Sequence, residues 1–322
     1  MAALEKKGVA IHYNTKAVSL VKDECFNVEG VSCITPEGRK DYLARGGVIL
    51  TTGGYGANEA MVDKYIGPWA SRLIVRGSPW ITGENILMAE EVQALLVNMD
   101  QFYAGPITPT GHCNPSPLMH AGYGIQVNTK GKRFVPETWL QVPKAKAIAE
   151  RTEDNRSFML IGADADKNAQ ILTNTIKRFA RLGFEVIKAD TIEEAAKKAG
   201  VPEKNLVETV REFNAAVKAG KAKELDPPYD YDEPHALETG PFYMIPAAGG
   251  MASTFGGPKI NKDAQVVNFE RRPIPGLYAA GEVTGGVHGK VRLGGSGLLD
   301  AFVFGRIAGR NAAQTCLIDT MR

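Results

Sequence analysis

The sequence predicts an α/β fold, and three features of the chain support that prediction. Short apolar segments run into glycine turns at residues 46–56 and again at residues 276–281. A glycine-rich stretch at residues 281–297 leads into a long segment, rich in apolar residues, that runs to the C-terminus. Strands that end in glycine turns and are followed by helices are typical of α/β proteins.

The first part of the chain is predicted to be rich in strands. Residues 1–8 have the pattern of a helix end, with Gly8 as its stop. The expected elements that follow are strands at 8–13, 17–23 and 28–36, a turn at 36–39, a buried strand at 46–50, a glycine turn at 51–56 and an amphipathic helix at 84–97. Each strand is an apolar or alternating run bounded by turn residues.

The second part of the chain mixes strands with helices. Thr191 and Glu194 form a capping-box pattern at the start of a helical stretch, and Gly220 supplies its stop. The expected elements are a strand at 124–128, a turn at 129–132, helical stretches at 167–182 and 191–219, an irregular connector at 224–243, strands at 264–269 and 276–280, and a terminal helix from Ser296.

Composition excludes several classes of function. The 322 residues are 44% apolar and 23% charged, with a net charge of +2, so no basic field for a nucleic acid is expected. The four cysteines lack metal-ligand spacing, and no metal site is predicted. No apolar run approaches the ~18 residues of a membrane span. These observations predict a cytoplasmic protein, or one subunit of a larger assembly, with no membrane span.

The glycine-rich stretch at 281–297 has the chemistry of a cofactor site. A helix N-terminus presents unpaired N–H groups and about half a positive charge. Glycines in front of it allow a planar or anionic ligand to reach those donors. A flavin fits this geometry because its reduced form gathers negative charge. Glu282, at the end of a predicted strand, is placed to accept hydrogen bonds from cofactor hydroxyls. The alternative is a glycine-rich helix start that only packs against a sheet.

The same stretch resembles the C-terminal flavin-binding motif of a known family. "IPGLYAAGEVTGGVHGKVRLGGSGLLDAFVFGRIAG" is similar to that motif in the fumarate reductase and succinate dehydrogenase flavoproteins, in the soluble flavocytochrome c and urocanate reductase-like branch. Ketosteroid dehydrogenases are more distant relatives. The supporting motifs, in family order, are "GGVILTTGGYG", "TGENILMAEEVQALLVNMDQF", "GIQVNTKGKRFVPE" and "STFGGPKINKDAQVVN".

The resemblance implies a domain organisation. A discontinuous, Rossmann-like FAD-binding domain is expected at residues 1–104 and 246–322, interrupted by an inserted α+β capping domain at 105–245. The family begins with a G-x-G-x-x-G unit for the ADP portion of FAD, and this sequence has none. The FAD-binding domain is therefore expected to be incomplete at its N-terminus. A separate polypeptide that carries the ADP-binding lobe, or an electron-donor protein, is an expected partner.

The resemblance also implies which residues bind the cofactor. FAD is the expected cofactor, and hydride transfer at its flavin ring is the chemistry that it supplies. The implied cofactor-binding residues are Ala17, Val18, Thr52, Gly53, Gly54, Gly281, Glu282, His288, Gly295, Ser296, Gly297, Leu298 and Leu299.

Substrate binding and catalysis are implied in the same way. Arg292 stands where the R-L-G-G motif places an arginine that anchors a substrate carboxylate, and a guanidinium provides a planar bidentate anchor. A structural salt bridge is the alternative role for Arg292. Gly295, Ser253 and Thr254 complete the implied substrate-binding set. The substrate class is a small-molecule unsaturated acid or ketone, reduced or formed at its carbon–carbon double bond.

Several positions depart from the fumarate reductase pattern. Gln141 stands at about the position where the family has a proton-donating arginine. Ser253 stands where the family has a histidine. The family's H-P-T motif aligns with 105–107 or 108–110, and neither contains a histidine. Fumarate itself is therefore not the expected substrate, and Trp139 suggests a larger one.

The proton donor has to be another group. His120 and Tyr123 are the predicted catalytic candidates for it, with Tyr103 and His112 as weaker ones. Two other functions stay open: a 3-ketosteroid dehydrogenase-like enzyme, and a non-catalytic subunit that needs a nucleotide-binding partner.

Overall fold

The computed structural model describes residues 2–110, 124–163, 171–184, 186–289 and 293–320. The predicted α/β fold is confirmed by the mixture of helices and open sheets. The chain divides into two compact units. Unit 1 comprises Met1–Met61, Ser78–Phe102 and Ser253–Arg322, and unit 2 comprises Val62–Gly77 and Tyr103–Ala252.

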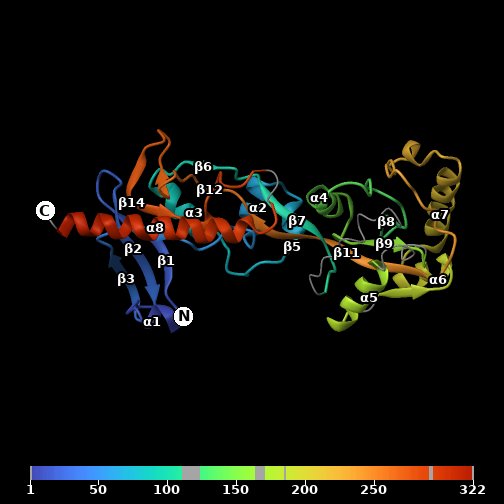
Figure 1. Cartoon of the computed structure of the whole chain (residues 1–322), viewed down its shortest axis with the longest axis horizontal. Coiled ribbons are helices and arrows are strands. Elements are labelled where there is room, and N and C mark those ends of the chain that lie inside the picture. The colour runs from blue at the N-terminus through green and yellow to red at the C-terminus, as the bar shows by residue number, and fades with distance from the viewer. Residues whose placement is uncertain (1, 111–123, 164–170, 185, 290–292, 321–322) are drawn as a thin grey trace. The chain divides into compact units, whose positions relative to one another are not determined.

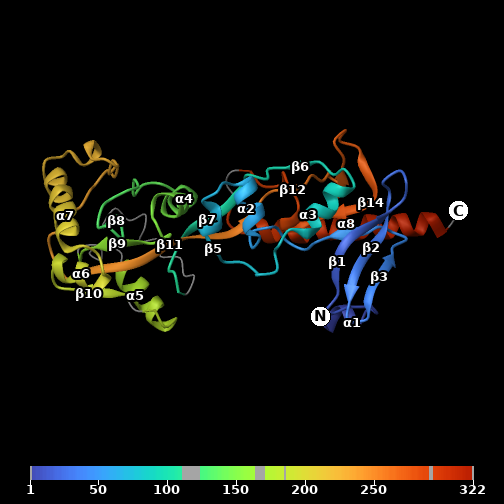
Figure 2. The same ribbon diagram turned by 180° about the vertical axis from the view of Figure 1, so that it is seen from behind.

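An antiparallel sheet of three strands lies near the N-terminus of unit 1 (Figures 1 and 2). It contains β1 (Lys16–Lys22), β2 (Val28–Thr35) and β3 (Gly38–Leu43), in chain order. The helix end predicted before Gly8 is α1 (Ala2–Glu5). The strand predicted at 8–13 is wrong, because its apolar residues Val9 and Tyr13 are exposed and no described strand pairs with them.

A second, partly parallel sheet of unit 1 positions the glycine turns. Its order is β13 (Gln265–Val267), β14 (Pro273–Ala279) and β4 (Val48–Leu50), and β14 runs parallel to β4. The terminal helix α8 (Ser296–Thr320) begins at the predicted residue and packs on this sheet (Figure 1). The contact joins Phe304, Ile307 and Ala308 of α8 to Tyr278 and Ile49.

The other elements of unit 1 are short. They are α3 (Glu84–Glu91), β6 (Leu96–Val97), β12 (Gly257–Pro258) and η5 (Gly281–Val283), whereas α2 (Glu59–Tyr65) only begins in unit 1 and η1 (Ala70–Arg72) belongs to unit 2. The helix predicted at 84–97 ends early. The chain turns at Gln93, which has a left-handed φ of 63°, and then enters β6, which pairs with β12.

Unit 2 is built on a larger sheet, and its longest strand was missed by the sequence prediction. The strands are β5 (Ile74–Val75), β7 (Phe102–Ile107), β8 (Gly124–Asn128), β9 (Ser157–Ile161), β10 (Ile187–Ala189) and β11 (Phe242–Thr254). Their order is β10-β11-β9-β8, and β5 and β7 also pair with β11. The glycine pair at 249–250 conceals β11 in the sequence, whereas β8 was predicted at its observed bounds.

Helices cover the sheet of unit 2. They are α4 (Gln141–Arg151), α5 (Ile171–Arg181), α6 (Ile192–Ala199), α7 (Glu203–Lys218) and the short η4 (Ala222–Glu224). The helical stretch predicted at 191–219 consists of α6 and α7, because Gly200 adopts a left-handed conformation between them. Thr191 caps α6 as predicted, and its hydroxyl accepts a hydrogen bond from the Glu194 N–H at 3.1 Å.

Candidate functional site

Two glycine turns meet at one edge of the β13-β14-β4 sheet. Because β4 and β14 are parallel, the turns after Leu50 and after Ala279 leave the sheet at the same end, and the Ala280 N–H donates to the Leu50 carbonyl at 3.0 Å. Gly53 and Gly281 both adopt positive φ values, of 84° and 77°, which favour glycine. In open α/β sheets, ligands bind outside the carboxyl ends of parallel strands.

A hydrogen-bonded network ties these turns to the end of β11. Glu282 Oε1 accepts from the Thr254 N–H at 3.1 Å, and Thr254 Oγ1 accepts from the Tyr55 N–H at 3.2 Å. A Cβ atom on Gly54 would lie 2.0 Å from Thr254 Oγ1 and 2.9 Å from Glu282 Oε1. Glycine is therefore required at position 54. The structure brings together Gly54, Thr254 and Glu282, three of the residues predicted from the sequence.

Ser253 lies next to this network and is buried. Its side chain is 3% exposed, and its Oγ has no hydrogen-bond partner among the described residues. A buried hydroxyl without a partner is costly in a folded protein. Such a group is expected where a ligand completes the hydrogen bonding, and the substrate-binding role of Ser253 stays a prediction.

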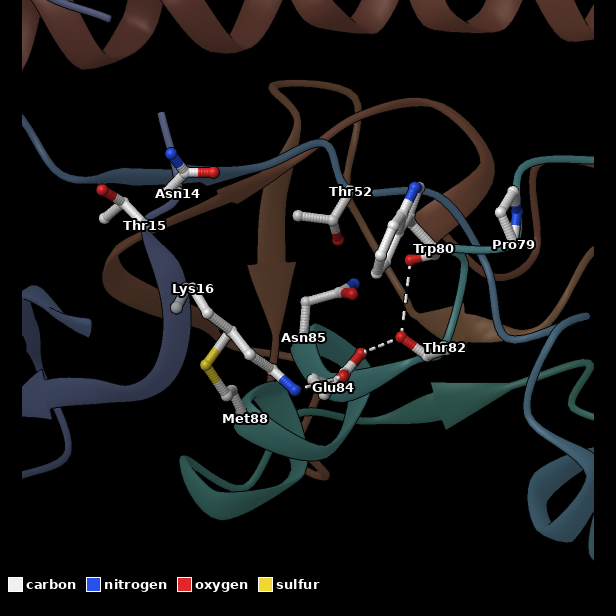
Figure 3. A pocket seen from close by; sticks show the side chains of 11 residues that line it. Asn14, Thr15, Lys16, Thr52, Pro79, Trp80, Thr82, Glu84, Asn85 and Met88 are labelled. Carbon is white, nitrogen blue, oxygen red and sulfur yellow. Dashed lines mark hydrogen bonds and ion pairs between the residues drawn. The ribbon is translucent and has the colours of Figure 1, made fainter. Parts of the chain in front are cut away.

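A cavity of about 730 Å³ opens in unit 1 near the start of β1 (Figure 3). Two predicted cofactor-binding residues, Ala17 and Thr52, line it, and Val18 follows in β1 as a half-buried residue. The other lining residues are Asn14, Thr15, Lys16, Pro79, Trp80, Thr82, Glu84, Asn85 and Met88. A cavity of this size is within the range of small-molecule and cofactor sites.

The charged groups of the cavity form one pair. Lys16 Nζ lies 2.9 Å from Glu84 Oε1, and Thr82 Oγ1 donates to Glu84 Oε2 at 2.5 Å. Partial burial raises the pKa of Glu84, but the hydrogen bonds from Thr82 and Lys16 outweigh it and hold the pKa below its ordinary value. Glu84 is therefore ionised at neutral pH, and its side chain remains 39% exposed to the cavity and solvent.

Nine of the residues that line this cavity were not among the predicted site residues, and Asn85 and Trp80 are two of them. Asn85 is buried, and Trp80 is a largely exposed aromatic side chain. The signal for Trp80 was its place in a short Pro- and Gly-containing loop, "GSPWITGEN", directly before α3. Asn85 gave no such signal, because a polar residue in the first turn of a helix is ordinary.

The predicted residues at the start of α8 are grouped around a separate pocket of about 390 Å³. Ser296, Leu299 and His288 line it, and His288 Nε2 lies 3.4 Å from Asp300 Oδ2. Ser296 Oγ donates to the Leu293 carbonyl at 2.7 Å. Gly295, Gly297 and Leu298 complete this helix start, and Gly295 adopts a φ of 82°. These positions are not part of the larger cavity.

The predicted catalytic residues Arg292, His120 and Tyr123 lie outside the described residues, as does His112. Gln141 and Tyr103, both in unit 2, lie side by side, and the Tyr103 hydroxyl donates to Gln141 Oε1 at 2.8 Å. Gln141, which the sequence predicts to stand near the family's proton-donor position, is therefore engaged as an acceptor.

The described part of the chain contains no group of three or more His, Cys, Asp or Glu side chains placed to hold a metal ion. No helix within those residues is long and apolar enough to cross a membrane.

Comparison with known proteins identifies the family. Residues 1–298 match the profile of a family described as FAD binding domain. The chain is 34% identical over 320 residues to NADH:acrylate oxidoreductase from Vibrio harveyi, and 33% identical over 310 residues to fumarate reductase (cytochrome) from Shewanella frigidimarina. These alignments cover 97% and 96% of this chain, but only 31% and 52% of the two relatives. The chain thus spans a third to a half of their lengths.

Solved structures give the same result. The open conformation of a flavocytochrome c3 fumarate reductase matches with a TM-score of 0.82 at 32% identity, over 98% of this chain and 54% of that one. A 3-ketosteroid delta1-dehydrogenase from Sterolibacterium denitrificans matches with a TM-score of 0.71 at 27% identity, over 97% of this chain and 61% of that one. The resemblance predicted from the sequence motifs is confirmed.

Proposed function

The chain belongs to the FAD binding domain family, and on that premise we propose that unit 1 forms part of the FAD site of an oxidoreductase. FAD is the cofactor of this family. The residues present fit it: two parallel strands end in glycine turns, Gly54 has no room for a side chain, and polar groups line a cavity of about 730 Å³. Ala17, Thr52, Gly54 and Glu282 are the residues that we expect to hold the cofactor.

The proposed reaction is reduction, or formation, of a carbon–carbon double bond next to a carboxylate or carbonyl group. FAD, when bound, supplies the hydride-equivalent chemistry. Arg292 anchors the carboxylate through its guanidinium, and Ser253 and Thr254 contribute to the same substrate site. The observation that carries the proposal is the buried Ser253 hydroxyl beside the Thr254–Glu282 hydrogen bond, because a bound substrate would supply the partner that Ser253 lacks.

The proposed substrate is an unsaturated acid other than fumarate. Named relatives act on fumarate, acrylate and urocanate, so the family accommodates several unsaturated acids. Gln141 cannot deliver a proton, and its carbonyl oxygen already accepts from Tyr103. His120 or Tyr123 takes the role of proton donor in this proposal.

The domain organisation is part of the same proposal. Unit 1 would correspond to the FAD-binding domain and unit 2 to the capping domain. A nucleotide-binding lobe would complete unit 1, and three observations support it. The relatives are two to three times longer than the matched region, β4 lies at the edge of its described sheet, and apolar side chains of α8 are exposed. An electron-donor protein would supply the reducing equivalents.

A cytoplasmic location belongs to the proposal as well. Two cysteines that the structure describes, Cys25 and Cys33, are free thiols. Free thiols are typical of proteins in a reducing compartment. Fractionation of cells that produce the protein tests this location.

The experiment that tests the activity uses the purified chain with FAD and with dithionite-reduced methyl viologen as the electron donor. Oxidation of the viologen dye is followed with acrylate, urocanate and fumarate in turn. We expect turnover of an unsaturated acid with fumarate as the poorest substrate, and loss of that turnover in Arg292→Ala. Rapid turnover of fumarate would contradict the proposed substrate. A chain that neither binds FAD nor turns over any acid would instead support a non-catalytic subunit.

A 3-ketosteroid dehydrogenase-like activity is the second candidate. The match to a solved 3-ketosteroid delta1-dehydrogenase favours it, as does the tyrosine hydroxyl of Tyr103 in β7. In that case Arg292 is a structural residue, so steroid oxidation would survive Arg292→Ala. 4-Androstene-3,17-dione with an artificial electron acceptor is the substrate for this assay.

A further inference from the structure

Arg76, which directly follows β5 in unit 2, carries a guanidinium group without a counter-charge. Its backbone N–H extends the pairing of β5 with β11 and donates to the Met251 carbonyl at 2.8 Å. The residue is only partly exposed, yet no group among the described residues accepts a hydrogen bond from its guanidinium. A guanidinium is a permanent cation, and removing it from water is costly unless an acceptor replaces the water.

The other partly buried arginine of the chain is paired. Arg76 and Arg133 are the two arginines within the described ranges that are not fully exposed. Arg133 donates to both oxygens of the Glu137 carboxylate, at 2.9 and 2.6 Å. Even the exposed Arg72, four residues before Arg76, donates to two backbone carbonyl oxygens at 3.3 and 3.4 Å. The hydrogen-bonding groups of Arg76 are therefore left for another molecule.

The glycine at position 250 of β11 makes room for this side chain. A Cβ atom on Gly250 would lie 3.1 Å from Arg76 Cδ and 2.4 Å from Ile107 Cδ1. The aliphatic stem of Arg76 thus lies against the bare strand, beside Ile107 of β7. A stem that is already held against a strand loses less conformational entropy when its guanidinium binds a ligand.

The same face of the sheet carries further hydrogen-bond donors. Side chains alternate along β7, so Tyr103, Gly105 and Ile107 lie on one face. Gln141 crosses Gly105, where an added Cβ atom would lie 3.1 Å from its Oε1, and that oxygen accepts from the Tyr103 hydroxyl. The two amide N–H groups of Gln141 lack an acceptor within the part of the chain that the structure describes. A cation and neutral donors on one face suit an anionic ligand.

We propose that Arg76 binds the carboxylate of the unsaturated acid that is the substrate of the proposed reaction. The planar guanidinium fork matches a carboxylate, which accepts two parallel hydrogen bonds from it. This inference rests on the proposed function, because it takes that acid as the ligand. It adds an anchor in unit 2 to the one proposed at Arg292.

Proton–nitrogen NMR of the purified chain measures binding at the guanidinium itself. The Nε–Hε signal of Arg76 is identified by its absence from the spectrum of Arg76→Met. We expect acrylate and urocanate to shift this signal saturably, and acrylamide, the neutral counterpart of acrylate, to leave it in place. Added salt should weaken the response to the acids. A signal that responds to neither acid, or equally to acrylamide, would overturn the inference.

Turnover with reduced methyl viologen tests the role in substrate binding. Arg76→Met should raise KM for acrylate and urocanate about ten- to hundredfold, the loss of a charge-assisted pair of hydrogen bonds, with a smaller effect on kcat. Arg76→Lys should recover part of that loss, because lysine keeps the charge without the fork. Arg72→Gln is the matched control and should keep the KM of the wild type, because its guanidinium is already engaged by the backbone.

A stability measurement separates ligand binding from a structural role. In the absence of acid, Arg76→Met should keep or raise the thermal midpoint, because methionine retains an apolar stem against Gly250 and removes an unpaired charge. Arg72→Gln should lower the midpoint, because it removes two hydrogen bonds. A fall in Arg76→Met as large as the fall in Arg72→Gln would show that Arg76 is structural and overturn the inference.

The outcomes distinguish this inference from the proposed function. Turnover by Arg76→Met with an unchanged KM would overturn the inference alone. A chain that reduces none of the acids, but whose Arg76 signal is still shifted by them, would overturn the proposed function and support the carboxylate site.

Discussion

The helices α7 and α8, one in each unit, differ in how far their apolar side chains are exposed to solvent. Helix α7 buries Leu206, Val210 and Phe213 in the core of unit 2 and carries charged residues on its other face. Helix α8 also packs on a sheet, through Phe304, Ile307 and Ala308. Yet Leu298, Leu299 and Phe302 of α8 are 71%, 63% and 75% exposed.

This difference indicates that α8 has an apolar face open for an interface, whereas the apolar face of α7 is buried in unit 2. Large exposed apolar patches on a helix mark an interface. Parallel sheets are normally covered on both faces, and β4 is the edge strand of its described sheet. The exposed face of α8 and the edge of β4 are therefore where the proposed nucleotide-binding lobe would pack. The following predictions test this contrast.

The largest expected effect is in the core of unit 2. Phe213 is 1% exposed and packs edge-on against Tyr229, with ring centroids 4.8 Å apart. Phe213→Ala should lower the free energy of unfolding by about 3–5 kcal/mol. The matched variant on α8, Phe302→Ala, should change it by less than about 0.5 kcal/mol. Urea unfolding of both variants checks this, and equal losses would show that α8 is packed as fully as α7.

A pH effect provides the second test of the closed core of unit 2. Lys144 of α4 is 2% exposed, and burial lowers the pKa of its ammonium to about 8, although the charge of Glu137 opposes that shift. Below pH 8 the lysine is protonated in both states, so the folded state bears the full cost of the buried charge. Between pH 8 and about 10.5 the unfolded chain binds more protons, so stability rises with pH, by on the order of 3 kcal/mol.

Unfolding measurements from pH 7 to pH 10 check the direction. Lys144→Met should flatten the rise and stabilise the protein at neutral pH. Above about pH 10 the buried Tyr229 acts in the opposite direction. Burial raises the pKa of its hydroxyl, so the phenol stays protonated in the folded state and ionises on unfolding, which lowers the stability. A stability that falls between pH 8 and 10 would contradict the assignment to Lys144.

The sequence predicted those parts of the fold and site that have a local pattern, and it missed those that depend on distant contacts. The strand–glycine turns around Gly54 and Glu282 and the start of α8 at Ser296 were all predicted, because glycine and strand patterns are local signals. The strand β11 was missed because its pairing is set by β9 and β10, which are distant in the sequence. Asn85 was missed because an unsatisfied donor becomes visible only when its neighbours are placed.

The smallest expected effect distinguishes an open helix face from a packed one. Cβ atoms added at Gly305 and Gly309, in the middle of α8, would meet nothing within 4 Å in the described structure. Alanine is more favourable than glycine in a helix by about 1 kcal/mol. Gly305→Ala and Gly309→Ala should therefore each stabilise the chain by about that amount.

The control for this last test is Gly257→Ala. Its Cβ atom would lie 1.9 Å from the Val283 carbonyl oxygen, so this substitution should destabilise the chain. Glycine at these two positions is compatible with close approach of the proposed lobe to the helix backbone. If the proposed lobe packs on α8, Gly305→Ala should weaken its binding while it stabilises the chain, and both are measurable with the same purified variant. A variant that is stabilised and still binds the lobe normally would leave the lobe in contact with another face of unit 1.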